Sequence, residues 1–177
     1  MAVAEQHSAR PDAADVRLTA WRTFLRAHAT VVRRLEAELL NEHGLPLATY
    51  DVLVQLSEAP GRALRMTELA DRVLLSRSGL TRLADRLERD GLLRRRACPS
   101  DARGTLAELT QAGLDRLREA WPTHARGVAE HFSDRFDDAE LATLATLLGK
   151  LDNTAPGAAL EALPGDCGAG VLAGPDA

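Results

Sequence analysis

The stretch that decides the fold is MTELADRVLLSRSGLTRLADRLERDGLLRRR (66–96), which continues as ACPSDARGTLAELT (97–110). Its first part holds two short segments in which apolar residues recur at helical spacing, with a brief turn between them. Thr67 can cap the first helix and Ser76 the second, because a hydroxyl oxygen accepts hydrogen bonds from the N–H groups of a first turn. Gly91 fits the end of the second helix, where a left-handed residue is common. The stretch therefore predicts a helix-turn-helix.

The second of these helices has two different faces. Its inward positions are apolar: Leu80, Leu83, Ala84 and Leu87. Its outward positions are polar or charged: Ser78, Thr81, Arg82, Asp85, Arg86 and Arg89. A helix that reads DNA needs this division, since a buried stripe fixes its angle while hydroxyls and arginines meet base edges and phosphates. We expect DNA contacts from Ser76, Arg77, Ser78, Thr81, Arg82 and Arg86.

A two-stranded wing is expected directly after the second helix. Residues 92–97 and 105–109 can pair as a hairpin around a loop at 98–104, and 63–66 can add a short strand beside it. An arginine near the tip of a projecting hairpin, here Arg103, suits a narrow minor groove, where the negative potential is deepest. Phosphates repel Asp101, so we expect it to orient Arg103 or an arginine of the second helix rather than to contact DNA.

These motifs resemble the MarR (multiple antibiotic resistance regulator) family of winged-helix transcription factors. The residues that carry the resemblance are TELA (67–70), SRSGLTRL (76–83), DRLERDGL (85–92), DARG (101–104) and LTQAG (109–113). The resemblance covers about 18–151 and implies a mainly α fold, in which a winged helix-turn-helix domain with a small β-wing lies between long N- and C-terminal dimerisation helices. It also implies a two-fold homodimer on a pseudo-palindromic DNA operator, with half-sites roughly 10 base pairs apart.

The chain divides into five segments on this interpretation. We expect a flexible tail at 1–15, a dimerisation helix at 16–45, the DNA-binding module at 46–110, dimerisation helices at 111–152 and a disordered tail at 153–177. The apolar stripes of both helical ends lack a core of their own, so they are expected to pack together and against a second copy. Pro122 should kink its helix or split it into two.

Charge is segregated along the sequence. Residues 62–104 contain eleven arginines and six acids, a net charge of +5, whereas the rest of the chain carries −9. A basic segment in an acidic protein favours a phosphate-binding surface, because the segment attracts the polyanion and the remainder repels it. A merely solvated charged surface predicts no such segregation.

Several other classes of protein are disfavoured. The polar N-terminus does not fit a signal peptide, and no apolar run approaches membrane-spanning length. Two cysteines give no disulfide framework, so we expect a cytoplasmic protein. Nucleophile elbows, phosphate loops, dinucleotide fingerprints and zinc-protease motifs do not occur, which indicates a non-enzyme without a cofactor.

The resemblance implies a regulator that acts as a repressor and is released by a small aromatic or anionic ligand. Such ligands bind between the dimerisation helices and the winged helix in this family, where Trp21, His28, Asp71 and Arg72 could form a pocket. The alternative is that Trp21 and Trp121 belong to the dimer core, and the sequence leaves both open.

Cys98 and the histidines suggest two further sites. Nearby arginines would favour a Cys98 thiolate, so a redox-responsive regulator is one alternative function, although an inert thiol is the favoured interpretation. His28, His43, His124 and His131 form no tight ligand cluster in the sequence, so we expect no metal site. A winged-helix adaptor that binds protein instead of DNA is the other alternative, but it would need exposed apolar residues on the second helix.

Overall fold

The computed structural model describes residues 15–73, 75–98 and 101–152, and its first element is a 28-residue helix, α1 (Val16–His43). Asp15 caps α1 by accepting a hydrogen bond from the N–H of Arg17 at 2.9 Å. Gly44 ends the helix in the left-handed conformation, with φ at +60°. The prediction of a long helix at 16–45 is confirmed.

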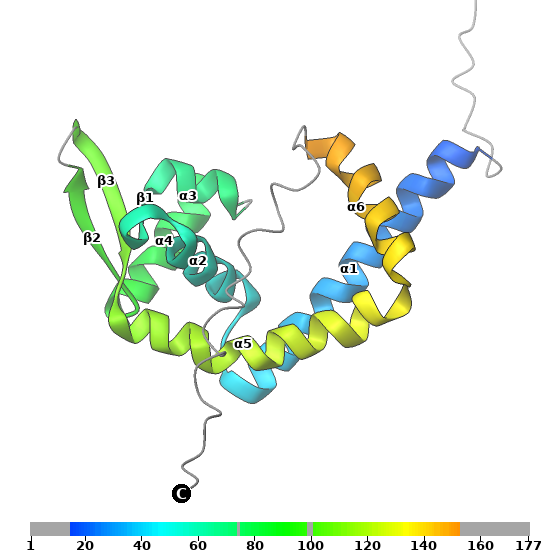
Figure 1. Cartoon of the computed structure of the whole chain (residues 1–177). Helices are drawn as coiled ribbons and strands as arrows, with labels where there is room; N and C mark the ends of the chain where they lie inside the picture. Colours follow the sequence, from blue (N-terminus) through cyan, green and yellow to red (C-terminus); the bar gives the residue numbers. More distant parts are fainter. Residues whose placement is uncertain (1–14, 74, 99–100, 153–177) are drawn as a thin grey trace, which may run out of the picture.

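The winged module follows α1 and lies at one end of the molecule, with its hairpin projecting outward (Figure 1). Its elements are α2 (Leu47–Glu58), η1 (Pro60–Arg62), β1 (Ala63–Arg65), α3 (Met66–Arg72), α4 (Arg77–Arg89), β2 (Leu93–Cys98) and β3 (Asp101–Leu109). The three strands form an antiparallel sheet in the order β1-β3-β2, so the short strand before the helix-turn-helix does pair with the wing.

Two local predictions about this module are wrong. Thr67 does not cap α3, because the helix already begins at Met66. The Glu68 carboxylate instead accepts from the backbone N–H of Arg65 at 3.3 Å. The wing loop is also shorter than the expected 98–104. The strand β3 already begins at Asp101, since a register shift next to Cys98 lets the pairing continue toward the tip.

The helices after the wing return the chain to α1. Thr110 caps α5 (Gln111–His131) by accepting from the N–H of Gly113 at 3.0 Å. Pro122 does not split this helix, which continues unbroken on both sides of it. Packing against α1 supports the continuity: directly after the proline, the Thr123 hydroxyl donates to Glu42 of α1 at 2.8 Å.

The chain then turns through η2 (Ser133–Arg135) into α6 (Asp138–Asp152). Asp137 and Glu140 form a reciprocal cap: the Asp137 carboxylate accepts from the Glu140 N–H at 2.8 Å, and the Glu140 carboxylate accepts from the Asp137 N–H at 3.0 Å. Figure 1 shows α6 beside the first turns of α1, at the end opposite the wing.

The buried core lies in the winged module and where that module meets α1 and α5. Tyr50, Leu53, Leu69, Leu80 and Leu87 are almost fully buried in it. The other end of the molecule is different, because large apolar side chains are exposed there: Val16, Trp21, Phe24, Leu25, Phe136, Leu147 and Leu151. No helix among the described residues is long and apolar enough to span a membrane.

Candidate nucleic-acid interface

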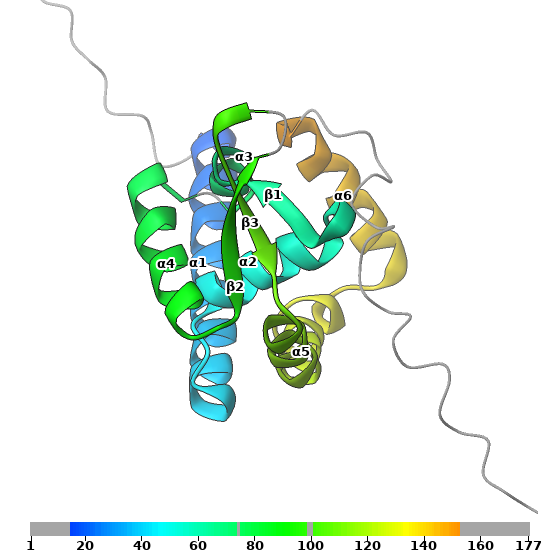
Figure 2. The same ribbon diagram turned by 90° about the vertical axis from the view of Figure 1, so that its left-hand side faces the viewer.

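The outer face of α4 is built by a cap and a buried stripe. Ser76 caps the helix, its Oγ accepting from the N–H of Gly79 at 3.1 Å. Leu80, Leu83 and Leu87 are buried against the rest of the module and fix the rotation of the helix about its axis. Figure 2 shows the resulting arrangement, with α4 at the outside of the module beside β2.

The residues predicted to contact DNA share this exposed face. All six belong to the cap or the helix and are exposed: Ser76, Arg77, Ser78, Thr81, Arg82 and Arg86. The hydroxyl of Thr81 donates to the carbonyl of Arg77 at 2.9 Å, while Ser76 and Ser78 lie 3.3 Å apart through their hydroxyl oxygens. The structure therefore brings these six residues together on the exposed face of one helix, with all but Arg86 at the cap or in the N-terminal half.

Three arginines of this face have unused charge. Arg77, Arg82 and Arg86 form no ion pair or side-chain hydrogen bond with any residue that the structure describes. An arginine on a helix can also serve a structural role by pairing with an acid of the same helix. These three arginines form no such salt bridge with a described residue. Two acids of the helix, Asp85 and Glu88, are paired with Arg95 instead, so the three guanidinium groups remain available for a polyanion.

The three consecutive arginines of β2 are, in contrast, all paired. Arg94 and Arg96 both contact the Glu108 carboxylate across the wing, at 2.6 and 2.8 Å. Their guanidinium groups lower the pKa of Glu108 by hydrogen bonding and charge, so the carboxylate stays ionised. Arg94 and Arg96 therefore join β2 to β3, and Arg95 has acidic partners of its own.

Arg95 points to the other side of the strand and joins the wing to α4. Its Nη1 lies 2.7 Å from the Asp85 carboxylate, and its Nη2 lies 2.6 Å from the Glu88 carboxylate. The hydrogen bonds from Arg95 lower the pKa of Glu88. Sequence reasoning did not identify these two partners.

The tip of the wing is only partly described. Asp101 and Arg103 lie in β3 by their backbone, and their side chains fall outside what the structure describes. The minor-groove role of Arg103 and the orienting role of Asp101 therefore stay predictions. Cys98 is described and is buried at the end of β2, which favours the inert interpretation of its thiol over the redox one.

The residues expected to form an effector pocket are divided between two places. A mostly apolar pocket of about 550 Å³ lies between α1, the end of α5 and α6, and His28 lines it with Phe24, Phe132 and Leu148. Trp21, Asp71 and Arg72 do not line this pocket: Trp21 is 55% exposed on α1, and the other two are exposed on α3. Trp121 packs against the core of the same chain.

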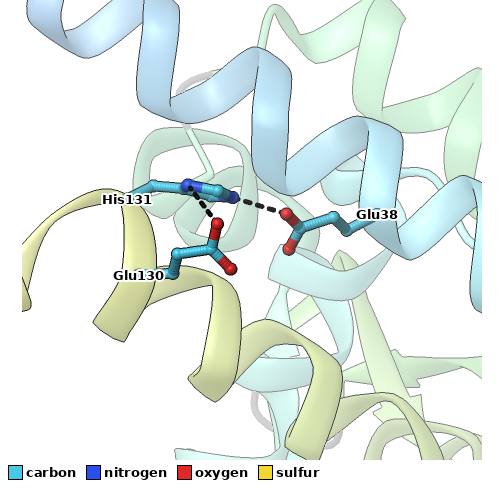
Figure 3. A group of neighbouring side chains, drawn as sticks. All are labelled: Glu38, Glu130 and His131. Atoms are coloured by element: carbon cyan, nitrogen blue, oxygen red, sulfur yellow. Dashed lines mark hydrogen bonds and ion pairs between the residues drawn. The ribbon is translucent and has the colours of Figure 1, made fainter.

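One group of potential metal ligands was missed by sequence reasoning. Glu38 of α1 meets Glu130 and His131 of α5, and each residue offers one ligand atom within 4.8 Å of the others (Figure 3). Glu38 and His131 are 93 positions apart, so no local pattern could have joined them.

Comparison with known proteins agrees with this geometry. The model of the MarR family matches residues 43–104. The HTH-type transcriptional regulator MhqR of Bacillus subtilis is 33% identical over 94 residues, which are 53% of this chain and 63% of MhqR. The aligned region thus spans less than two thirds of that relative.

Two solved structures are similar over more of their length. The MarR family transcriptional regulator AbsC of Streptomyces coelicolor is 36% identical, with a TM-score of 0.73 over 78% of this chain and 93% of AbsC. Sco3205 from the same organism, solved in complex with DNA, is 35% identical, with a TM-score of 0.72 over 77% of this chain and 85% of Sco3205. The chain belongs to the MarR family and has its winged-helix fold.

Proposed function

We propose that this protein is a sequence-specific duplex-DNA-binding regulator of transcription. The observation that carries the proposal is the exposed face of α4, where Arg77, Arg82 and Arg86 have no ion-pair partner in the described part of the chain and lie beside serine and threonine hydroxyls. Arginines and short hydroxyls are the groups that recognise guanine edges and phosphates in a major groove. A protein-binding adaptor is the weaker candidate, because this face lacks exposed apolar side chains.

The proposed active form is a homodimer. Exposed apolar side chains gather on the first turns of α1 and on α6, where Leu151 is 72% exposed. Such a surface is typical of an interface between copies rather than of a solvated face. A two-fold dimer presents two α4 helices, and we propose a pseudo-palindromic operator with half-sites roughly 10 base pairs apart.

We further propose that the protein represses transcription until a ligand releases it from DNA. The helices α1 and α5 connect the dimer surface to the winged module, so they set the separation of the two α4 helices. A small aromatic or anionic ligand that binds more tightly when this separation does not fit DNA would lower DNA affinity. The loss would equal the difference between the ligand's binding free energies at the two separations. The protein would act in the cytoplasm, on a bacterial chromosome.

Fluorescence anisotropy with duplex DNA from the protein's own upstream intergenic region tests the proposal. We expect site-selective binding with a steep dependence on salt, against an unrelated duplex as control. If the operator lies outside this intergenic region, a binding selection from random-sequence duplexes should find it. Failure of both experiments to yield a preferred sequence would contradict the proposal and favour the adaptor.

A further inference from the structure

A buried imidazole joins α1 to α5 away from the DNA-facing surface. The side chain of His131 is only 7% exposed, and its Nε2 lies 2.5 Å from Oε1 of Glu38. Glu130, the preceding residue on α5, places its Oε1 3.9 Å from the Nδ1 of the same ring. Two carboxylates from two helices therefore converge on one histidine (Figure 3).

The spacing of these groups is close to that of a metal site. Zn²⁺ binds imidazole nitrogen and carboxylate oxygen at about 2.1 Å, which places tetrahedral ligand atoms about 3.4 Å from one another. Here all three ligand atoms lie within 4.8 Å of one another. Modest side-chain rotations would bring them into coordinating positions, and Glu130, which is largely exposed, is free to make the largest of these.

A second observation points to a missing cation. The Oε2 atom of Glu38 is buried and has no hydrogen-bond donor among the described residues. A buried carboxylate oxygen without a donor or counter-charge is costly, so such an atom calls for an explanation. Gly127 makes the space for it, because a Cβ at that position would lie 2.5 Å from Oε2.

Two arginines lie beside this group among the described residues, and neither contacts the Glu38 oxygen: Arg135 donates to the backbone carbonyl of Glu130 at 3.0 Å, and Arg34 contacts the imidazole. Arg34 of α1 places its Nη1 3.4 Å from Nδ1 of His131, on the imidazole rather than on the Glu38 carboxylate. Arg34 is exposed and can turn toward solvent. A divalent ion near His131 would repel its guanidinium group, so Arg34 competes with metal rather than assisting it.

We propose that Glu38, Glu130 and His131 bind a divalent first-row transition-metal ion, with Zn²⁺ as the representative. The ion would replace the proton between His131 Nε2 and Glu38 and would use both oxygens of Glu38, including the buried Oε2. One imidazole and two carboxylates form a mixed nitrogen and oxygen donor set that suits Zn²⁺ or Mn²⁺ and not Mg²⁺. The site would bridge the two helices that connect the dimer surface to the winged module. This inference does not depend on the proposed DNA binding.

Metal titration of the full-length, metal-free protein tests the site. Isothermal titration with Zn²⁺ should give one equivalent per chain, and Zn²⁺ should raise the thermal midpoint while Mg²⁺ should not. Glu38→Gln and His131→Gln should each weaken Zn²⁺ binding at least tenfold and abolish the thermal shift. Glu130→Gln should weaken binding less, and Arg34→Ala should tighten it.

His124→Gln is the matched control, because it removes another partly buried histidine of α5 outside this group. It should leave Zn²⁺ affinity unchanged. Circular dichroism of each variant before titration separates loss of the site from loss of the fold, and Glu130→Gln alters only an exposed carboxyl. The inference is overturned if the wild type binds no Zn²⁺, or if Glu38→Gln and His131→Gln bind it as the wild type does.

Discussion

Arg95 in the wing and Glu88 in α4 are joined twice. The Arg95 backbone N–H donates to Glu88 Oε1 at 2.8 Å, and its side-chain Nε donates to Oε2, also at 2.8 Å. A backbone contact combined with a side-chain contact fixes the direction of the strand as well as its distance from the helix. The two elements that would enter neighbouring grooves of DNA are therefore held in one orientation.

Arg95→Ala should lower operator affinity by about tenfold, because the wing loses its attachment to α4. Arg94→Ala is the matched control: it removes the same charge from the adjacent residue, which contacts Glu108 within the sheet. Its effect on operator affinity should be small, since an exposed ion pair contributes little and the wing keeps its attachment to α4 through Arg95. Fluorescence anisotropy on one operator compares the two.

Glu88→Gln separates positioning from charge. Removal of an acid near DNA would raise affinity if only electrostatics mattered, whereas loss of the contact with Arg95 should lower it. We expect affinity to fall. An affinity above that of the wild type would show that Arg95 does not act by positioning the wing.

Arg82→Ala should weaken operator binding by about 1–3 kcal/mol if the side chain contacts a base, or reduce the salt slope by about 1 if it contacts a phosphate. The reason is that Arg82 has no competing partner among the described residues. Arg118→Ala on α5, which breaks an exposed pair with Asp115, is the control. Equal binding by both variants would exclude α4 from the interface.

Arg103→Ala tests the tip of the wing. Loss of affinity should be largest for operators with A·T-rich flanks, because a narrow minor groove attracts arginine most strongly. Operators that differ only in their flanks give the comparison by anisotropy. A uniform loss across flanks would indicate a phosphate contact instead.

Asp51 should make stability depend on pH. Burial, and then the charge of Glu36, raises the pKa of Asp51 to about 6. A carboxyl with a raised pKa binds its proton more tightly in the folded state, so the free energy of unfolding falls as pH rises from about 4 through 6. Asp51→Asn should reduce this dependence of the free energy of unfolding on pH. It should also stabilise the protein at pH 7 by on the order of 1 kcal/mol.

Thermal denaturation between pH 4 and 8 measures this effect. Asp115→Asn is the control, since it makes the same change in charge at an exposed carboxyl of α5. A pH dependence that Asp51→Asn leaves unaltered would mean that another group causes it.

Leu147→Asp should convert a dimer into a monomer. Leu147 is exposed on α6, and a charge placed in an apolar interface is strongly unfavourable. Thr146→Asp, at an exposed neighbouring position, should disturb the dimer less. Sedimentation velocity measures the mass of each variant, and a dimeric Leu147→Asp would exclude this part of α6 from the interface.

Local signals predicted much of the fold. The apolar stripe predicted a long helix at 16–45, where α1 lies, and Ser76 predicted the start of α4, because caps depend on residues within one turn. Thr67 was misleading, since Glu68 offered a competing cap. The six α4 residues were predicted to share a face because helical periodicity alone decides that.

Contacts between distant segments could not be predicted in this way. The pairing of Arg94 with Glu108 depends on strand register, and that of Arg95 with Glu88 on the angle between a strand and a helix. The meeting of Glu38 with His131 depends on how α1 packs against α5. Charge counting along the chain therefore overestimates how many arginines are available to DNA.

The double pairing of Glu108 with Arg94 and Arg96 bears on how the protein would search a chromosome. Affinity for arbitrary DNA comes from uncompensated positive charge, and a genome offers millions of competing positions. A wing strand whose three arginines are matched by Glu108, Asp85 and Glu88 adds little to this background, while Arg77, Arg82 and Arg86, which form no ion pair with a described residue, lie on the helix that would read sequence. Fewer molecules would then be retained on unrelated DNA, so a small cellular pool would be enough to occupy the operator.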